Sequence, residues 1–336
     1  MAAADEGLGE QGIVFDGSSV EISLAELLPV TKHPKPPQHY PAKLPVSAML
    51  VDAERDAILT GGYHEILIWS LEGKLLHRIE NQGQRTYALD IHPDKPLLIA
   101  ASGTPGELGE VRLFDLQSRK MLAVVTKADE AIMDAQFSPD GSKLAVAMPS
   151  GATRVYAHVG AGGFRLETEL LGHSSQVTAL DWHVDGNRLA TASRDHSAKV
   201  FNVAEGRSVA TFTGHSACVN DLCFVTQNWV TSVGSDGLAV TWNSDNGRKH
   251  KDLVTGKQAM LGCEVLENKV LLVGDAVVQW MEFGNAEMKQ RWPMTGRCTT
   301  CSSSKESTKT VVIGTQNGKV HILTSDGQSR FFSAAP

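Results

Sequence analysis

The chain has 336 residues with a hydrophobic content of 42% and a formal net charge of −7. That content supports a large buried core, while the acidic balance offers no general attraction for nucleic acid or for anionic lipid, so we expect neither as a partner. The net charge weakly favours a basic partner surface. No stretch approaches the ~18 consecutive apolar residues of a membrane-spanning helix, so membrane insertion is not expected.

The N-terminal part of the chain predicts little globular structure. Residues 1–10 lack the positive and apolar regions of a secretory signal, which favours a cytoplasmic location; a mature periplasmic chain whose leader had been removed would look the same. Residues 20–24 alternate as an edge strand does. Residues 31–45 hold five prolines, which favour an extended strap, so we assign residues 1–45 to an edge strand and a proline-rich strap.

From residue 46 to residue 333, residues that close short β-like runs recur at a near-constant interval. The steps between them are 45, 42, 45, 41, 38 and 43 residues, close to the ~40–45 residues of one four-stranded propeller blade. These positions are Trp69, Phe114, Tyr156, Phe201, Trp242, Trp280 and Leu323. The period predicts an all-β, seven-bladed propeller with blades at about 46–80, 84–126, 130–170, 173–212, 215–255, 258–293 and 295–333.

The turns support this register. Ser138-Pro-Asp-Gly141 and Val184-Asp-Gly186 are each expected between the first and second strands of a blade, where Asp-Gly supplies tight-turn geometry. The glycine-rich run 103–109 is interpreted as a turn between the second and third strands of blade two. No helix follows that run, so it does not resemble a phosphate-binding loop.

Blades four and five carry a repeated polar motif. Each opens with Gly-His and continues with a hydroxyl residue, a turn aspartate and a final aromatic residue. Blade four has His173, Ser193 and Asp195, with Thr191 on the same expected strand, and blade five has His215, Ser232, Asp236 and Trp242. This pattern resembles the WD-repeat family.

The resemblance implies a structural hydrogen-bond chain from the turn carboxylate to the histidine, the strand hydroxyl and the tryptophan N–H. Phe201 has no N–H, so only blade five is expected to complete the chain. A catalytic triad is disfavoured because the grouping recurs at the blade period.

Blades one to three, over residues 45–150, look like bacterial WD-repeat domains that accompany c-type cytochrome modules. The similar features are the run 62–65 before the Trp69 strand and the glycine-rich loop of blade two. No Cys-x-x-Cys-His run for covalent haem attachment is present in the chain. The resemblance therefore implies a bacterial propeller without conferring electron transfer.

Metal and cofactor chemistry finds no support in the sequence. The five cysteines are odd in number and do not form a disulfide framework. Cys298 and Cys301 have metal-ligand spacing, but on a strand they are expected to face opposite sides. The twelve histidines show no ligand spacing. We expect no metal, no cofactor and no catalytic residue.

Aligning the first strands of the blades places a set of polar and aromatic residues on one rim. Arginine and tyrosine are common anchors of protein interfaces. The predicted partner-binding face comprises Tyr63, Arg85, Tyr87, Met133, Gln176, Arg194, Asn220 and Arg297.

The leading hypothesis is a non-enzymatic scaffold that binds a protein or peptide partner. The alternatives are an accessory domain of an envelope redox complex and an enzyme with a site in the central channel. For the enzyme, the sequence analysis finds no repeated pattern of inward carboxylates.

Overall fold

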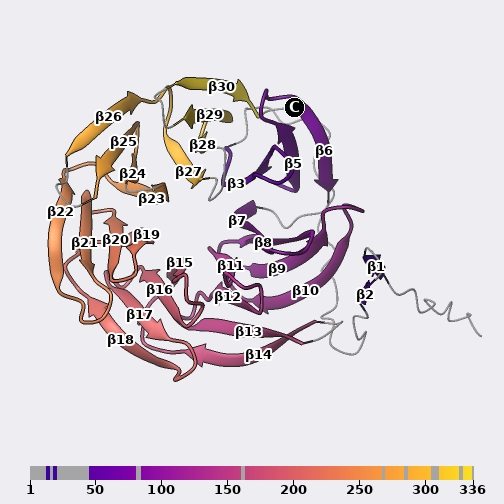
Figure 1. Cartoon of the computed structure of the whole chain (residues 1–336), viewed down its shortest axis with the longest axis horizontal. Helices are drawn as coiled ribbons and strands as arrows, with labels where there is room; N and C mark the ends of the chain where they lie inside the picture. The colour runs from indigo at the N-terminus through magenta and orange to yellow at the C-terminus, as the bar shows by residue number, and fades with distance from the viewer. Residues whose placement is uncertain are drawn as a thin grey trace, which may run out of the picture.

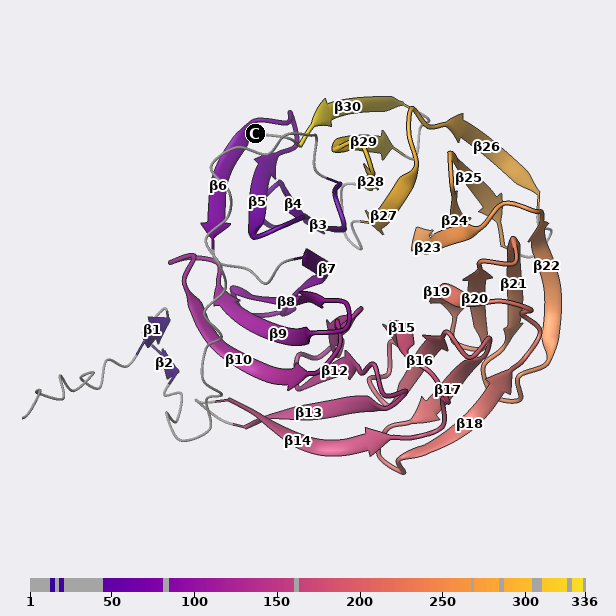
Figure 2. The same ribbon diagram turned by 180° about the vertical axis from the view of Figure 1, so that it is seen from behind.

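The computed structural model describes residues 13–15, 18–20, 45–80, 85–159, 163–266, 269–283, 287–303, 310–324 and 328–334. Within these ranges the chain is all-β, and seven four-stranded antiparallel sheets stand around a central opening (Figures 1 and 2). The predicted seven-bladed propeller is therefore confirmed.

Each blade consists of four consecutive strands. Blade one is β3 to β6 (Ala48–Asp52, Ala57–Gly61, Glu65–Ser70, Leu75–Glu80), blade two is β7 to β10 (Arg85–Ile91, Leu97–Thr104, Leu108–Asp115, Met121–Ala128), blade three is β11 to β14 (Ala135–Phe137, Lys143–Ala147, Thr153–Val159, Gly163–Leu170), and blade four is β15 to β18 (Val177–Trp182, Arg188–Ser193, Ala198–Asn202, Arg207–Phe212). Blade five is β19 to β22 (Val219–Thr226, Trp229–Gly234, Leu238–Asn243, Lys249–Thr255), blade six is β23 to β26 (Met260–Leu266, Lys269–Gly274, Val277–Glu282, Met288–Pro293), and blade seven is β27 to β30 (Cys298–Ser303, Thr310–Thr315, Lys319–Thr324, Ser329–Ser333).

Burial changes systematically across each blade, from the centre of the ring to its outside. The first strands surround the central opening and the fourth strands form the outer wall (Figure 1). Second strands such as β4 and β28 are buried along their whole length, whereas β30 is largely exposed. A second strand is covered on both faces by neighbouring blades, which explains its continuous apolar run.

The periodic residues that predicted the fold all lie on third strands. Each of the seven, from Trp69 on β5 to Leu323 on β29, is buried. The predicted turns also hold, because Gly141 and Gly186 lie between first and second strands with φ near +67°. That backbone conformation favours glycine.

The blades are joined by seven hydrophobic clusters, one at each junction between neighbours. The last of these joins blade one to blade seven, with Met49, Ile58 and Trp69 packed against Val312 and Ile322. The ring is therefore closed by packing between complete blades, as the predicted four strands of blade seven imply.

The glycine-rich run of blade two forms the predicted turn between β8 and β9. A Cβ at Gly109 would lie 2.1 Å from the carbonyl oxygen of Glu130, and one at Gly103 would lie 2.8 Å from the Cα of Ala131. Glycine is thus required by the close approach of the connection between β10 and β11.

The N-terminal segment is described only in part. β1 (Ile13–Phe15) and β2 (Ser18–Val20) pair antiparallel in a sheet of their own. Residue 20 ends β2, and the rest of the predicted edge strand lies outside the described residues. The same holds for the proline-rich strap, apart from residue 45.

Candidate functional site

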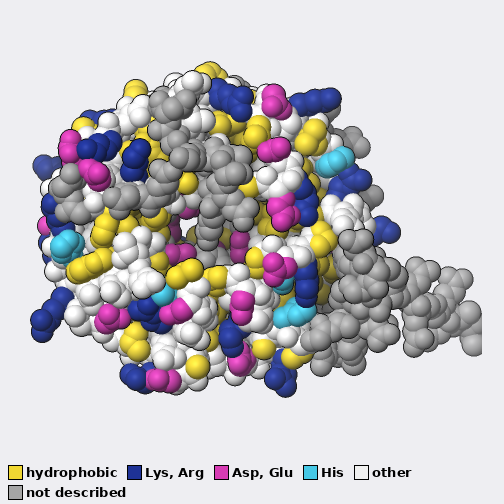
Figure 3. Space-filling model, in the orientation of Figure 1, with side chains coloured by type: hydrophobic (Ala, Val, Ile, Leu, Met, Phe, Trp, Pro, Cys, Tyr) yellow, Lys and Arg dark blue, Asp and Glu magenta, His cyan; other side chains and the backbone are white. Residues whose placement is uncertain are grey.

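A cavity of about 1340 Å³ runs through the centre of the ring. The seven first strands line it, and they all run in the same direction along its axis. Their starts define one opening, which we call the strand-start mouth; their ends define the strand-end mouth. Acidic side chains are visible around the central opening (Figure 3).

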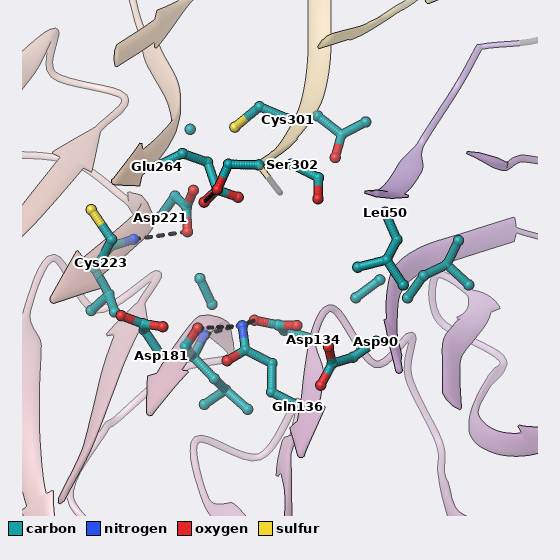
Figure 4. A pocket seen from close by; sticks show the side chains of 18 of the residues that line it. Leu50, Asp90, Asp134, Gln136, Asp181, Asp221, Cys223, Glu264, Cys301 and Ser302 are labelled. Atoms are coloured by element: carbon teal, nitrogen blue, oxygen red, sulfur yellow. Dashed lines mark hydrogen bonds between the residues drawn. The ribbon is translucent and has the colours of Figure 1, made fainter. Parts of the chain in front are cut away.

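Five carboxylates from consecutive blades project toward this cavity (Figure 4). They are Asp90, Asp134, Asp181, Asp221 and Glu264. The expectation that the sequence holds no repeated inward carboxylate pattern is therefore wrong.

Successive carboxylates are 44, 47, 40 and 43 residues apart, so one lies in each of blades two to six. Asp181 directly follows Leu180, whereas Asp221 directly precedes Leu222, the leucine at the same place of the next first strand. No single aligned position therefore holds an acid in every blade, and an alignment of the first strands does not reveal the pattern.

The carboxylates tie each first strand to the next blade. Asp90 accepts the N–H of Phe137 at 2.7 Å, and Asp181 accepts the N–H of Phe224 at 2.6 Å. In the same way, Asp134 accepts the N–H of Leu180, and Asp221 accepts the N–H of Cys263, in each case from the first strand of the next blade.

Glu264 completes the pattern by accepting from the hydroxyl of Ser303 at 2.9 Å. A first strand has a neighbour on one edge only, so its inner N–H groups need such acceptors. The ring of acids thus has a structural role at the inner edge.

Burial raises the pKa of two of these acids. The pKa of Asp134 rises to about 7, although the hydrogen bond from Leu180 opposes the shift. The pKa of Asp221 is also raised well above its ordinary value by burial. The described residues contain no group of histidine, cysteine and acidic side chains arranged to hold a metal ion.

Three cysteines at successive blade positions, Cys223, Cys263 and Cys301, also line the cavity. All five cysteines are free. Burial is the largest cause that raises the pKa of Cys263 and Cys301, so these thiols resist ionisation.

The spacing of Cys298 and Cys301 on a strand predicted that they face opposite sides of the sheet. That prediction is wrong. A register shift between Cys298 and Thr300 breaks the alternation of β27, and both cysteines pack against the same cluster at the junction of blades six and seven.

The structure brings six of the eight predicted partner-face residues to the cavity lining: Arg85, Tyr87, Met133, Gln176, Arg194 and Asn220. Tyr63 joins them through Arg85, whose guanidinium carbon lies 6.0 Å from the Tyr63 ring centre and 5.1 Å from that of Tyr87. Arg297 lies apart from this lining and pairs with Asp275.

Two of the six residues are engaged within the fold. Gln176 is buried and donates to the carbonyl of Ala131 at 2.9 Å. Asn220 donates to the carbonyl of Met260 at 2.7 Å. Both amides therefore link neighbouring blades, which leaves arginine and tyrosine as the prominent side chains of the strand-start mouth.

The predicted hydrogen-bond chain is complete in blade five. His215 contacts Asp236 through Nδ1 and the hydroxyl of Ser232 through Nε2, at 3.0 and 2.9 Å. Trp242 donates its indole N–H to the same hydroxyl at 3.1 Å. Burial lowers the pKa of His215, although Asp236 opposes the shift.

In blade four the predicted hydroxyl partner is wrong. His173 contacts Asp195 through Nδ1 and Thr191 through Nε2, at 2.9 and 2.8 Å. Ser193 instead donates to the carbonyl of Gln176 at 3.0 Å. Burial alone would raise the pKa of Asp195, but hydrogen bonds led by that from Ser197 bring it down to about 2.

Comparison with known proteins agrees with this geometry. The family "WD domain, G-beta repeat" matches residues 164–202 and 206–243. The first segment begins on β14 and the second begins one residue before β18, which are fourth strands, and each segment ends on the third strand of the next blade. The chain is thus a seven-bladed β-propeller that contains WD repeats.

Several curated proteins are similar to parts of the chain. Echinoderm microtubule-associated protein-like 3 of Mus musculus is 27% identical over 45% of this chain and 17% of its own length. TOPLESS of Arabidopsis thaliana is 26% identical over 52% of this chain and 17% of its own length. Poly(A)+ RNA export protein of Schizosaccharomyces pombe is 29% identical over 40% of this chain and 36% of its own length.

The matched regions therefore span less than two thirds of these relatives. None of the three bears on the resemblance to cytochrome-linked domains, which stays a prediction. Among the described residues there is no helix long and apolar enough to cross a bilayer.

Proposed function

We propose that this propeller is a protein-interaction scaffold that binds a partner at the strand-start mouth and catalyses no reaction of its own. WD-repeat relatives such as TOPLESS support the general role. The observation that carries the choice of surface is the grouping of Tyr63, Arg85, Tyr87 and Arg194 at one opening of the cavity.

The fold suits this role because the side chains of the mouth come from rigid neighbours. Arg85 and Tyr87 belong to β7, and Arg194 follows β16 directly. A site held by strands needs little ordering when a partner binds, which lowers the entropic cost of association. The acids deeper in the cavity already accept hydrogen bonds from the first strands of neighbouring blades.

The test compares partners recovered by the native chain and by a Tyr87→Ala, Met133→Ala double variant. The control is Phe331→Ala, which removes an exposed aromatic side chain from β30 on the outer wall. A protein lost only with the double variant is then purified, and its affinity for all three chains is measured by calorimetry. Equal affinity for all three chains would refute the proposed surface.

A further inference from the structure

We propose that the strand-start mouth recognises an acidic peptide segment, with an aspartate or glutamate carboxylate of the partner paired to the guanidinium of Arg85. This inference rests on the proposed function and adds the chemistry of the partner. It follows from how Arg85 is held, from the charges around it, and from the acids deeper in the cavity.

Arg85 is positioned by aromatic rings and has no acceptor for its side chain among the described residues. It begins β7 and lies over the rings of Tyr87 and Tyr63. None of the described residues accepts a hydrogen bond from its guanidinium, and its Nε is buried without a partner. The fold therefore holds a half-buried cation whose hydrogen-bonding capacity is unused.

Such an arginine is prepared for a planar anion. Contacts with aromatic rings use the flat faces of the guanidinium, whereas its N–H donors lie in the plane. The outer N–H groups are then free to donate two parallel hydrogen bonds to a carboxylate. Because the rings limit the movement of the side chain, little rotamer freedom is lost on binding.

The neighbouring charges favour a single negative charge. Arg194 is exposed at the same mouth, and no described residue forms an ion pair with it. Glu130 is the acidic neighbour, and its Oε1 is occupied by the N–H groups of Gly106 and Ala131. Burial is the main cause that raises the pKa of Tyr87, while Arg85 and Arg194 lower it and Glu130 raises it, so these groups share one electrostatic environment.

The acids inside the cavity limit how far an acidic peptide can extend beyond the strand-start mouth. Asp90 and Asp181 line the cavity near the ends of β7 and β15, where a second acidic residue would meet like charge. The net charge of −7 favours basic partners at long range, but exposed charges beyond a Debye length of ~8 Å are largely screened. The two arginines therefore dominate at the mouth itself.

The experiment uses a peptide array in which the central positions carry aspartate or glutamate, asparagine or glutamine, phosphoserine, or lysine and arginine, among randomised neighbours. The tightest acidic peptide is labelled with fluorescein, and its affinity is measured by anisotropy for the whole chain. Arg85→Ala and Arg85→Lys test the guanidinium, and circular dichroism checks that both variants fold. Arg291→Ala on the exposed outer strand β26 is the matched control for loss of one positive charge.

We expect acidic peptides to bind at least about tenfold more tightly than their amide counterparts, with that preference lost in Arg85→Ala and weakened in Arg85→Lys but kept in Arg291→Ala. Equal binding of acid and amide peptides, a strict requirement for phosphoserine, or no peptide binding would each overturn the inference. The partner experiment above still decides the proposed function in all three cases.

Discussion

Two tryptophans at the same position of neighbouring blades have opposite hydrogen-bonding states. Trp242 on β21 donates to Ser232, whereas Trp280 on β25 is buried and its indole N–H has no partner among the described residues. Both side chains are almost completely buried. The pair therefore separates the contribution of the hydrogen bond from that of the ring.

Replacement of each tryptophan by phenylalanine removes the same volume and the same donor. We expect Trp242→Phe to lower the free energy of unfolding more than Trp280→Phe, by about 1–3 kcal/mol, because only the former breaks a hydrogen bond and only the latter removes an unsatisfied buried group. Urea unfolding of the native chain and both variants measures the difference. Equal losses would show that the hydrogen-bond chain of blade five adds no stability.

The hydroxyl residue that contacts His173 in blade four is Thr191 and not the predicted Ser193, and the spacing along the strand explains why. Ser232 and Thr191 each lie ten residues before the final aromatic residue of their blade, whereas Ser193 lies eight before it. The blade-five spacing would have selected Thr191. Residue type alone does not distinguish Thr191 from Ser193, because both hydroxyl groups lie on β16. Only the register of the strand decides which of them faces His173.

At the scale of single strands, the apolar pattern predicts the second and third strands better than the first. The buried runs of β4 and β28 follow directly from burial on both faces. A first strand must also satisfy its own inner edge, and two alternative carboxylate positions achieve this. Asp134 and Asp181 thus serve one purpose from different positions of their strands, so no single aligned position shows the repeat.

The buried carboxyl of Asp134 links the join between β11 and β15 to pH. Its pKa rises from an ordinary value of 3.8 to about 7 in the folded chain. Between these values the folded state binds more protons than the unfolded state, so this residue makes the free energy of unfolding fall as pH rises. The contribution is fully present below pH 4 and is lost as pH passes 7.

Asp134→Asn keeps an oxygen that can accept from Leu180 and removes the titration. We expect the variant to gain stability relative to the native chain as pH rises from 5 to 8, by up to roughly 1.4 kcal/mol per pH unit below pH 7. Chemical unfolding at several pH values measures this. The same substitution at exposed Asp129 controls for loss of charge, and a difference from the native chain that does not vary with pH would contradict the prediction.

For the whole molecule, the aromatic period was sufficient to predict the number of blades and their order. The proposed binding surface was harder to define because residues from different blades build it. The residues predicted from the sequence include Arg85, Tyr87 and Arg194, which line the cavity, but also Gln176, whose side-chain amide donates to the carbonyl of Ala131 inside the ring. Whether a polar side chain faces outward depends on the neighbouring blade, which one repeat does not encode.

The junction between blades seven and one differs from the other six because no direct connection joins its two blades within the described chain. Packing holds this seam, together with hydrogen bonds such as that from the N–H of Val46 to the carbonyl of Thr315 at 3.3 Å. If the seam separates, the other six junctions keep their clusters. Local opening at this place therefore requires less free energy than unfolding of the whole ring.

Val312→Ala at the seam and Val230→Ala between blades four and five test this view, since both valines are fully buried. Each should lower the global free energy of unfolding by about 1–2 kcal/mol. Val312→Ala is also expected to speed hydrogen exchange most strongly for amides of β3 and β28, about tenfold for each 1.4 kcal/mol lost, because those amides exchange when the seam opens. Val230→Ala should instead reduce protection evenly around the ring, because its junction opens only with the whole ring. The same exchange pattern in both variants would show that the ring has no preferred place to open.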